Sequence, residues 1–425
     1  TAAATAYGST SAPVITSTAV SGTPAVHTAT LTTTGVNPVA AVAAKMGVTA
    51  GVVDITGAAA LKTVSIDGYD SNALAGTNNI KGLTNTALDT ISLANGGGMT
   101  IASQAATLAL NLEKVAGAIA FTAAPTTLNI KSTGNNTIGT LTAAATEALN
   151  VSGTGTLSAV SSSNLAATKA IKVSETAGLN LTGATLTALT SVDTTGTTGT
   201  VTLTIDSTKT SYAGGAGVDT VTSSNTTTAT RALDLGAGND TLVMAASSVV
   251  PTAVLKGGEG NDTLSLLAAD AVTLGGATAF AAKIESFERL QVTGATGVQN
   301  INLGNLGFTN HVTVAGVTTG VLTLTDLANN ATVALTGNVA TGVTAVVKGA
   351  ATGTADVLNL VLSSTGNLTG GTLTAANVET ININMVDTQA APQTKNANTL
   401  TLATDQATTV TVTGAGDLVL TTGNS

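Results

Sequence analysis

Three short glycine-rich turns recur along the chain and constrain its fold more than any other feature. They occupy residues 214–221, 235–242 and 257–264. The first and third match the pattern Gly-Gly-x-Gly-x-Asp followed by a threonine and an aliphatic residue, and the second departs only at Leu235. The aspartates of the three turns are 21 and 22 residues apart. This spacing predicts one such turn per coil of a repeating structure, all on the same side.

The residue types of these turns predict metal binding. Glycine lets the backbone turn tightly and direct carbonyl oxygens inward, and each aspartate adds a carboxylate, which together suit a hard cation such as Ca²⁺. We expect two ions between three stacked loops, although glycine and aspartate also form ordinary turns. The expected metal-site residues are Gly214, Gly215, Gly217, Asp219, Leu235, Gly236, Gly238, Asp240, Gly257, Gly258, Gly260 and Asp262.

The same repeat continues upstream without the metal-binding pattern. Residues 128–134, 149–155 and 171–178 each read as a short alternating strand that runs into a turn, and turn glycines recur about every 20 residues. A single coil of this length cannot bury its own apolar side, so the coils must stack. The sequence therefore predicts an all-β fold, a right-handed parallel β-helix or β-solenoid with two or three short strands per coil.

The repeat divides the chain into four predicted parts. Residues 1–56 are expected to be an irregular N-terminal segment, and residues 57–268 a β-solenoid that ends in the calcium loops. Residues 269–289 form a connecting segment, in which residues 280–284 are expected to be a short helix or an excursion from the coil. A second solenoid run covers residues 290–425.

Composition agrees with this fold and excludes several classes of protein. The 425 residues include 43% hydrophobic, 9% charged and 2% aromatic residues, and this hydrophobic content argues against disorder. No apolar run approaches the roughly 18 residues of a transmembrane segment. The net charge of −9 and the lack of basic clusters argue against nucleic-acid binding. The absence of cysteine is compatible with a bacterial surface protein, and with no signal peptide visible at Thr1 we expect a processed chain or a fragment.

Four segments carry a resemblance to a known family. Residues 284–293 (IESFERLQVT), 353–364 (GTADVLNLVLSS), 377–383 (NVETINI) and 398–404 (NTLTLAT) resemble segments of calcium-dependent surface-layer proteins of Gram-negative bacteria. Together with the glycine turns, the resemblance covers residues 210–425 best. It implies a repeats-in-toxin (RTX) type surface-layer (S-layer) protein, a secreted, calcium-bound β-solenoid that assembles with copies of itself into a two-dimensional lattice on the cell surface.

The resemblance also implies partners that this sequence does not identify. Members of the family usually carry a domain that binds lipopolysaccharide and a C-terminal type I secretion signal, and neither is recognisable here. A secreted RTX-type adhesin or filamentous surface protein is the alternative function. A polysaccharide-degrading enzyme would need paired carboxylates outside the calcium loops, and the sequence has no convincing set, so we expect no enzymatic activity.

Other polar residues have simpler interpretations. The turn at residues 67–70 is acidic but lacks the glycine frame, so a plain turn is favoured over an accessory calcium site. His27 and His311 have no catalytic pattern around them. Lys256, Lys283 and Arg231 are expected to be solvated, with lattice or sugar contacts as the less favoured interpretation.

The strand-like residues 408–413 have no polar cap after them, so we expect further chain or a neighbouring copy to cover them.

Overall fold

A computed structural model describes residues 14–16, 27–32, 52–54, 61–67, 79–82, 87–224, 228–245, 248–388 and 397–423. It is an all-β chain of about 15 turns with parallel strand pairing, as the sequence predicts. The right-handed winding stays a prediction. The chain divides into two compact units, residues 1–221 and 222–425, and each is described separately.

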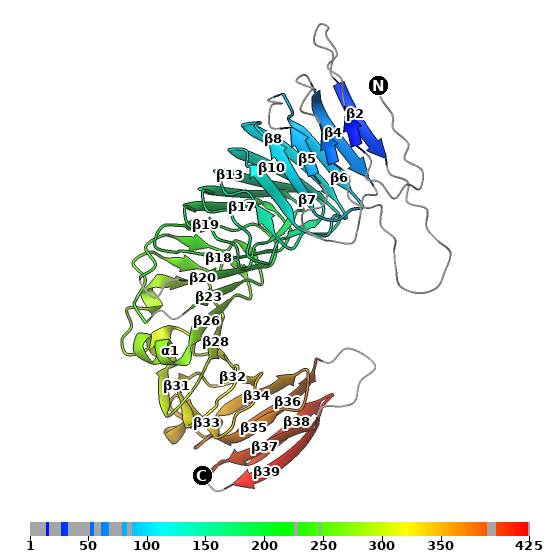
Figure 1. Ribbon diagram of the computed structural model, residues 1–425. Coiled ribbons are helices and arrows are strands. Elements are labelled where there is room, and N and C mark those ends of the chain that lie inside the picture. Colours follow the sequence, from blue (N-terminus) through cyan, green and yellow to red (C-terminus); the bar gives the residue numbers. More distant parts are fainter. Residues whose placement is uncertain are drawn as a thin grey trace, which may run out of the picture. The chain divides into compact units, whose positions relative to one another are not determined.

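Unit 1 is a stack of short parallel strands arranged in three sheets (Figure 1). The first sheet contains β1 (Val14–Thr16), β3 (Val52–Asp54), β5 (Asn79–Gly82), β7 (Met99–Ser103), β9 (Ile119–Ala123) and β12 (Leu141–Thr142). The second contains β2 (His27–Thr32), β4 (Leu61–Asp67), β6 (Thr90–Ala94), β8 (Thr107–Glu113), β10 (Thr127–Thr133), β13 (Ala148–Gly153), β15 (Ala170–Glu175), β17 (Ser191–Thr197) and β19 (Ser211–Ala213). The third contains β11 (Asn136–Thr137), β14 (Thr156–Ser158), β16 (Gly178–Asn180), β18 (Val201–Ile205) and β20 (Asp219–Ser223).

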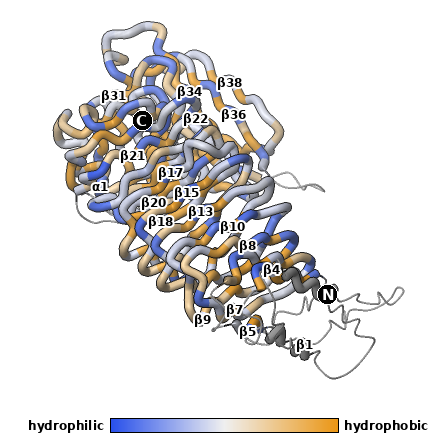
Figure 2. Tube along the Cα trace, turned by 90° about the horizontal axis from the view of Figure 1, so that it is seen from above, coloured by the Kyte–Doolittle hydropathy of each residue, from blue (hydrophilic) through white to orange (hydrophobic). Residues whose placement is uncertain are grey.

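The three upstream repeats stack in register. Leu128 of β10 lies beside Leu149 of β13, which lies beside Ile171 of β15. All three side chains are buried, and polar residues alternate with the apolar ones along each strand. Hydrophobic positions recur in this way on the neighbouring strands of unit 1 (Figure 2). The predicted coil of about 20 residues is confirmed here, because only stacking of equivalent apolar positions produces a continuous core.

The strands begin earlier than the sequence predicts. β1 pairs with β3, and β2 pairs with β4, so the sheets extend into residues 1–56, which were expected to be irregular. The segment His27–Thr32 alternates threonine with other residues, and β-branched residues favour strands.

Unit 2 contains four further sets of parallel strands. One set is β21 (Leu233–Asp234), β24 (Leu255–Lys256) and β27 (Ile284–Glu285), and a second is β22 (Ala237–Gly238) and β25 (Glu259–Gly260). The third is β23 (Thr241–Met244), β26 (Thr263–Leu267), β28 (Arg289–Thr293), β30 (His311–Val314), β32 (Ala331–Leu335), β34 (Val357–Ser364), β36 (Thr380–Asp387) and β38 (Thr409–Gly414). The fourth is β29 (Gln299–Asn302), β31 (Val321–Leu327), β33 (Gly342–Val347), β35 (Thr369–Thr374), β37 (Ala397–Ala403) and β39 (Asp417–Gly423).

The expected connecting segment is a helical excursion from an otherwise continuous coil. It contains α1 (Ala268–Leu274) and the 3₁₀ helix η1 (Ala281–Lys283). The strands before and after it still pair, β24 with β27 and β26 with β28, so the solenoid does not end there. Two more short helical elements, α2 (Leu303–Leu306) and the 3₁₀ helix η2 (Ala350–Thr352), lie in later turns.

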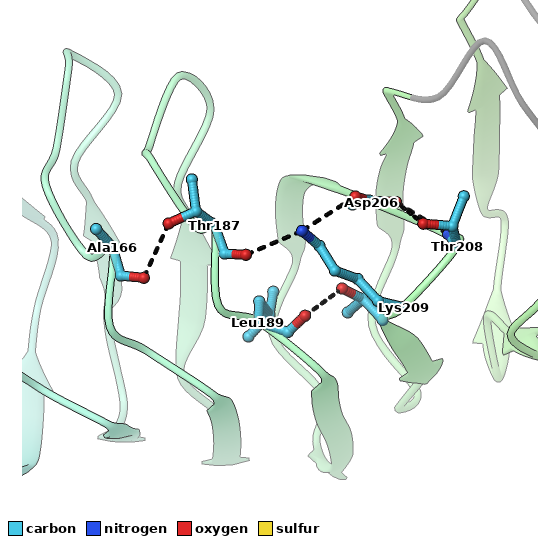
Figure 3. Close-up of polar contacts among 7 residues, drawn as sticks. Ala166, Thr187, Leu189, Asp206, Thr208 and Lys209 are labelled. Carbon is cyan, nitrogen blue, oxygen red and sulfur yellow. Dashed lines mark hydrogen bonds and ion pairs between the residues drawn. The ribbon is translucent and has the colours of Figure 1, made fainter.

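Threonine hydroxyls link successive coils of unit 1 through hydrogen bonds (Figure 3). The Oγ1 of Thr187 donates to the carbonyl of Ala166 at 3.0 Å, and the Oγ1 of Thr210 donates to the carbonyl of Leu189 at 2.7 Å. Lys209 extends this set, because its Nζ donates to the carbonyl of Thr187 at 2.9 Å. These bonds are one reason why a threonine-rich chain suits a stack of coils.

Candidate metal centre

The second and third glycine loops lie together in unit 2 with the same backbone conformation. Ala237 pairs with Glu259 and Gly238 pairs with Gly260, a step of one coil. The φ angles of the paired glycines agree, at 95° for Gly236 and 113° for Gly258, and at 144° for Gly238 and 139° for Gly260. Side chains rarely adopt such φ angles, so the glycines of the pattern are required by the backbone.

The two loops also approach each other too closely for side chains at these positions. A Cβ atom at Gly258 would overlap the carbonyl oxygen of Gly236, and one at Gly260 would overlap the carbonyl oxygen of Gly238. The amide of Glu259 donates to the carbonyl of Gly236 at 2.8 Å. The carbonyl of Gly236 therefore forms a hydrogen bond to the next loop, and the inward orientation of carbonyls toward a cation stays a prediction.

The aspartates of these loops are buried. Asp240 is 1% exposed and Asp262 is 0% exposed, and the amide of Asp240 donates to the Oδ1 of Asp262 at 2.7 Å. The Oδ2 of Asp262 is also buried, and no group of the described residues donates a hydrogen bond to it. A Cβ at Gly257 would lie 2.7 Å from this oxygen, so glycine leaves room beside it. A buried carboxylate oxygen without a donor fits a cation ligand.

Glu288 adds negative charge from the next coil. Its Oε2 accepts a hydrogen bond from the amide of Asp262 at 2.8 Å. Burial raises the pKa of Asp262, the amide of Asp240 lowers it, and the charge of Glu288 raises it further. Desolvation and like charge thus both disfavour the ionised carboxylate, and a bound divalent cation would reverse that preference.

Backbone oxygens would have to supply much of the coordination. Among the residues that the structure describes, no three Asp, Glu, His or Cys side chains gather closely enough to hold a metal. Ca²⁺ takes six to eight oxygen ligands, including backbone carbonyls. Asp240 and Asp262 would therefore hold the ion together with loop carbonyls, and the ion would supply positive charge between the stacked turns.

The first glycine loop, in unit 1, differs from the other two. Gly214 follows β19, and neither Gly215 nor Gly217 has a positive φ angle. The amide of Ala216 donates to the carbonyl of Thr197 at 3.0 Å, so this loop packs on the preceding turn of unit 1. A matching sequence pattern has thus produced a different turn conformation.

Asp219 of the first loop is bonded to protein donors. It is 1% exposed, its Oδ1 accepts from the amide of Val201 at 3.1 Å, and its Oδ2 accepts from the hydroxyl of Tyr212 at 2.6 Å. Burial raises the pKa of Asp219 to about 6, although these hydrogen bonds lower it. The three aspartates, expected to be equivalent, therefore have different surroundings, and the fit to a cation is strongest at Asp262.

The remaining predicted residues are mostly held by internal contacts. Leu235, the departure from the glycine pattern, is fully buried in the core and offers only its backbone oxygen. Lys256 pairs with Glu285 at 3.4 Å, and the Nζ of Lys283 donates to the carbonyl of Thr252 at 2.9 Å. Arg231 is exposed.

The acidic turn and the histidines are described only in part. The Oδ1 of Asp67 accepts from the Nδ2 of Asn95 at 2.8 Å, and residues 68–70 lie outside the described residues. His27 begins β2, but its side chain lies outside the described part of the structure. Burial lowers the pKa of His311, and the charge of Arg289 lowers it further.

A shallow pocket of about 400 Å³ lies beside the third loop. Asn261, Arg289 and His311 line it together with Phe287 and Phe308. The two phenylalanines are 8% and 2% exposed, so they close the floor of the pocket and do not present free ring faces for sugar stacking.

Two residues of the candidate site were not predicted as such. Glu288 lies in the segment 284–293 that carries the resemblance, and its position one coil after Asp262 is a usable signal for a site residue. Tyr212 lies seven residues before Asp219, and no sequence pattern indicates that its hydroxyl meets that carboxylate.

No protein-family model and no curated protein matches this chain. No helix in the described part of the chain is long and apolar enough to span a membrane.

Proposed function

We propose that this chain is a calcium-stabilised structural protein of the RTX type that assembles with copies of itself into an S-layer on the bacterial surface. The observation that carries the proposal is the stacked pair of glycine loops, in which the buried Oδ2 of Asp262 lies beside Gly257 and receives no hydrogen bond from any described group. The parallel solenoid supports it, because stiff stacked coils present fixed surfaces for lattice contacts.

Calcium has a direct structural role in this proposal. Without a cation, the carboxylates of Asp240, Asp262 and Glu288 bring negative charge into adjacent coils with incomplete compensation. A bound ion neutralises that charge and links the loops, so binding free energy contributes to folding. Three equivalent stacked loops would make Asp240→Ala the variant that weakens calcium binding most, because Asp240 would then face an ion on each side. Since the first loop has a different conformation, we expect Asp262→Ala, which removes the Oδ2 that fits a cation ligand best, to weaken calcium binding at least as much.

The test is negative-stain electron microscopy of the purified chain with calcium and with a chelator. We expect ordered two-dimensional arrays in calcium and their loss when the chelator is added. Discrete, unassociated particles under both conditions would favour the adhesin alternative. Attachment to lipopolysaccharide, through a domain not recognisable in this sequence, and secretion to the cell surface belong to the same proposal.

A further inference from the structure

A second buried aspartate resembles Asp262 but lies outside every glycine-pattern loop. Asp356 directly precedes β34 and is 6% exposed. Its Oδ2 is shielded from solvent, and no described group donates a hydrogen bond to it. Burying an ionised carboxylate without a partner is costly, so this oxygen needs an explanation.

Glycine provides space next to this oxygen as well. A Cβ at Gly353 would overlap the Oδ2 of Asp356, although the φ angle of Gly353, −73°, suits any residue. The preceding turn, η2, follows Gly349, whose φ angle is 82°. The carbonyl of Gly349 accepts hydrogen bonds from the amides of Thr352 at 3.0 Å and Gly353 at 3.1 Å. A side chain at residue 353 would therefore displace the carboxylate of Asp356 from its observed position.

The next coil contributes a glutamate in the same way at both aspartates. The Oε2 of Glu379 accepts from the amide of Asp356 at 2.7 Å, as Glu288 does from Asp262 at 2.8 Å. Each glutamate directly precedes the next strand of the same sheet, β36 or β28. Two acidic side chains from successive coils therefore meet at each place.

This recurrence does not follow from the repeat register. Pairing along the sheet aligns Leu264 with Leu290, Val312, Val333 and Leu360 in turn. Asp262 is two residues before Leu264, whereas Asp356 is four residues before Leu360. The same combination of buried carboxylate, adjacent glycine and next-coil glutamate has arisen at a shifted position, which argues for a common requirement.

We propose that the turn at residues 349–356 binds a divalent cation, with the Asp356 carboxylate as its side-chain ligand. Oxygen ligands at a turn favour Ca²⁺ over softer metals. Because the described residues contain no cluster of three acidic or histidine side chains, backbone carbonyls of the turn complete the coordination. The site neither uses the glycine-pattern loops nor depends on lattice assembly.

Calcium stoichiometry of the full chain tests the site directly. Equilibrium dialysis against Ca²⁺ is expected to give one bound ion fewer per chain for Asp356→Asn than for the unchanged protein. Asp405→Asn is the matched control, because Asp405 is exposed and its Oδ1 accepts from the amide of Asn377 at 2.7 Å, a role that asparagine can keep. An Asp356→Asn chain that binds as many ions as the control overturns the proposal.

Amide hydrogen exchange gives a second readout that needs no variant. In the unchanged chain, exchange at residues 349–357 is expected to slow about tenfold at a calcium concentration ten times the dissociation constant. In Asp262→Asn, this protection should persist while protection of residues 235–262 is lost, which separates this site from the glycine loops. Exchange at residues 349–357 that does not respond to calcium contradicts the proposal, whatever the lattice experiment shows.

Discussion

At the scale of single residues, buried threonine hydroxyls link one coil to the next. Thr146 and Thr168 are fully buried, and their Oγ1 atoms donate to carbonyls of the preceding coil, those of Pro125 at 2.7 Å and Thr146 at 2.9 Å. Each bond satisfies a carbonyl that lies away from water. Threonine therefore combines strand propensity with a donor at the place where the coil turns.

Thr168→Val is expected to destabilise unit 1 by about 1–3 kcal/mol, because the buried carbonyl of Thr146 loses its donor while the side-chain volume is kept. Thr187→Val is the matched control, since Thr187 donates to the carbonyl of Ala166 from an exposed position where water can replace it. Urea denaturation of both variants measures the difference. Equal stability of the two would contradict the role of the buried hydroxyl.

The pKa of Asp219 predicts a pH dependence of the calcium-free protein. Burial raises this pKa from 3.8 to about 6, so the folded state holds a proton that the unfolded state has released. Stability should therefore fall as the pH rises from about 4 to about 6, by an amount on the order of 3 kcal/mol, and stay level above that. Denaturation with a chelator across this range should show the trend, and Asp219→Asn should remove that part of it.

At the scale of elements, the glycine loops depend on backbone geometry at a few positions. Gly258 has a φ angle of 113°, and a Cβ there would overlap the carbonyl oxygen of Gly236. A side chain at Gly258 would strain the backbone and would also push the third loop away from the second. The coil is less sensitive to inserted residues than the glycine loops are to side chains. It continues past the helical excursion at α1, because β24 still pairs with β27.

Gly258→Ala is expected to cost on the order of 2 kcal/mol or more and to weaken calcium binding, because strain and overlap act together. Gly366→Ala serves as the control, since a Cβ there would meet nothing within 4 Å. Thermal unfolding in calcium and calorimetric titration of the metal test both parts. Unchanged calcium affinity in Gly258→Ala would argue against the loop pair as the metal site.

At the scale of the whole molecule, the proposed function requires association between copies. Exposed aliphatic side chains are found on β38 and β39, where Val410, Val412 and Val419 are 41%, 47% and 62% exposed. Single exposed valines are ordinary on protein surfaces, so they do not by themselves identify an interface. The stiffening of the coils by calcium that the proposed function implies is the stronger reason to expect ordered association.

Light scattering in millimolar calcium should therefore detect particles that grow with protein concentration and dissociate when a chelator is added. Asp262→Asn should need more calcium for the same growth, and Asp405→Asn should behave as the unchanged chain. A protein that remains monomeric at every concentration would support the adhesin alternative.

The sequence by itself determined the coil. Equivalent apolar residues about 20 positions apart can be buried together only by stacking, and the strands at Leu128, Leu149 and Ile171 were predictable for that reason. Composition and the glycine pattern likewise led to the turns at 235–240 and 257–262. The apolar repeat and the glycine pattern are local or periodic, so both can be recognised from the sequence alone.

Only the tertiary structure decided which carboxylates lack hydrogen-bond donors. Asp219 and Asp262 occupy the same place in one sequence pattern, but Tyr212 and Val201 donate to the first, while no group in the described part of the chain donates to the Oδ2 of the second. Asp356 follows no metal-binding pattern, and its similarity to Asp262 appears only when Glu379 and Gly353 lie beside it. The reason is physical: burial and hydrogen bonding depend on neighbours one coil away, and turn lengths vary enough to change which neighbours those are.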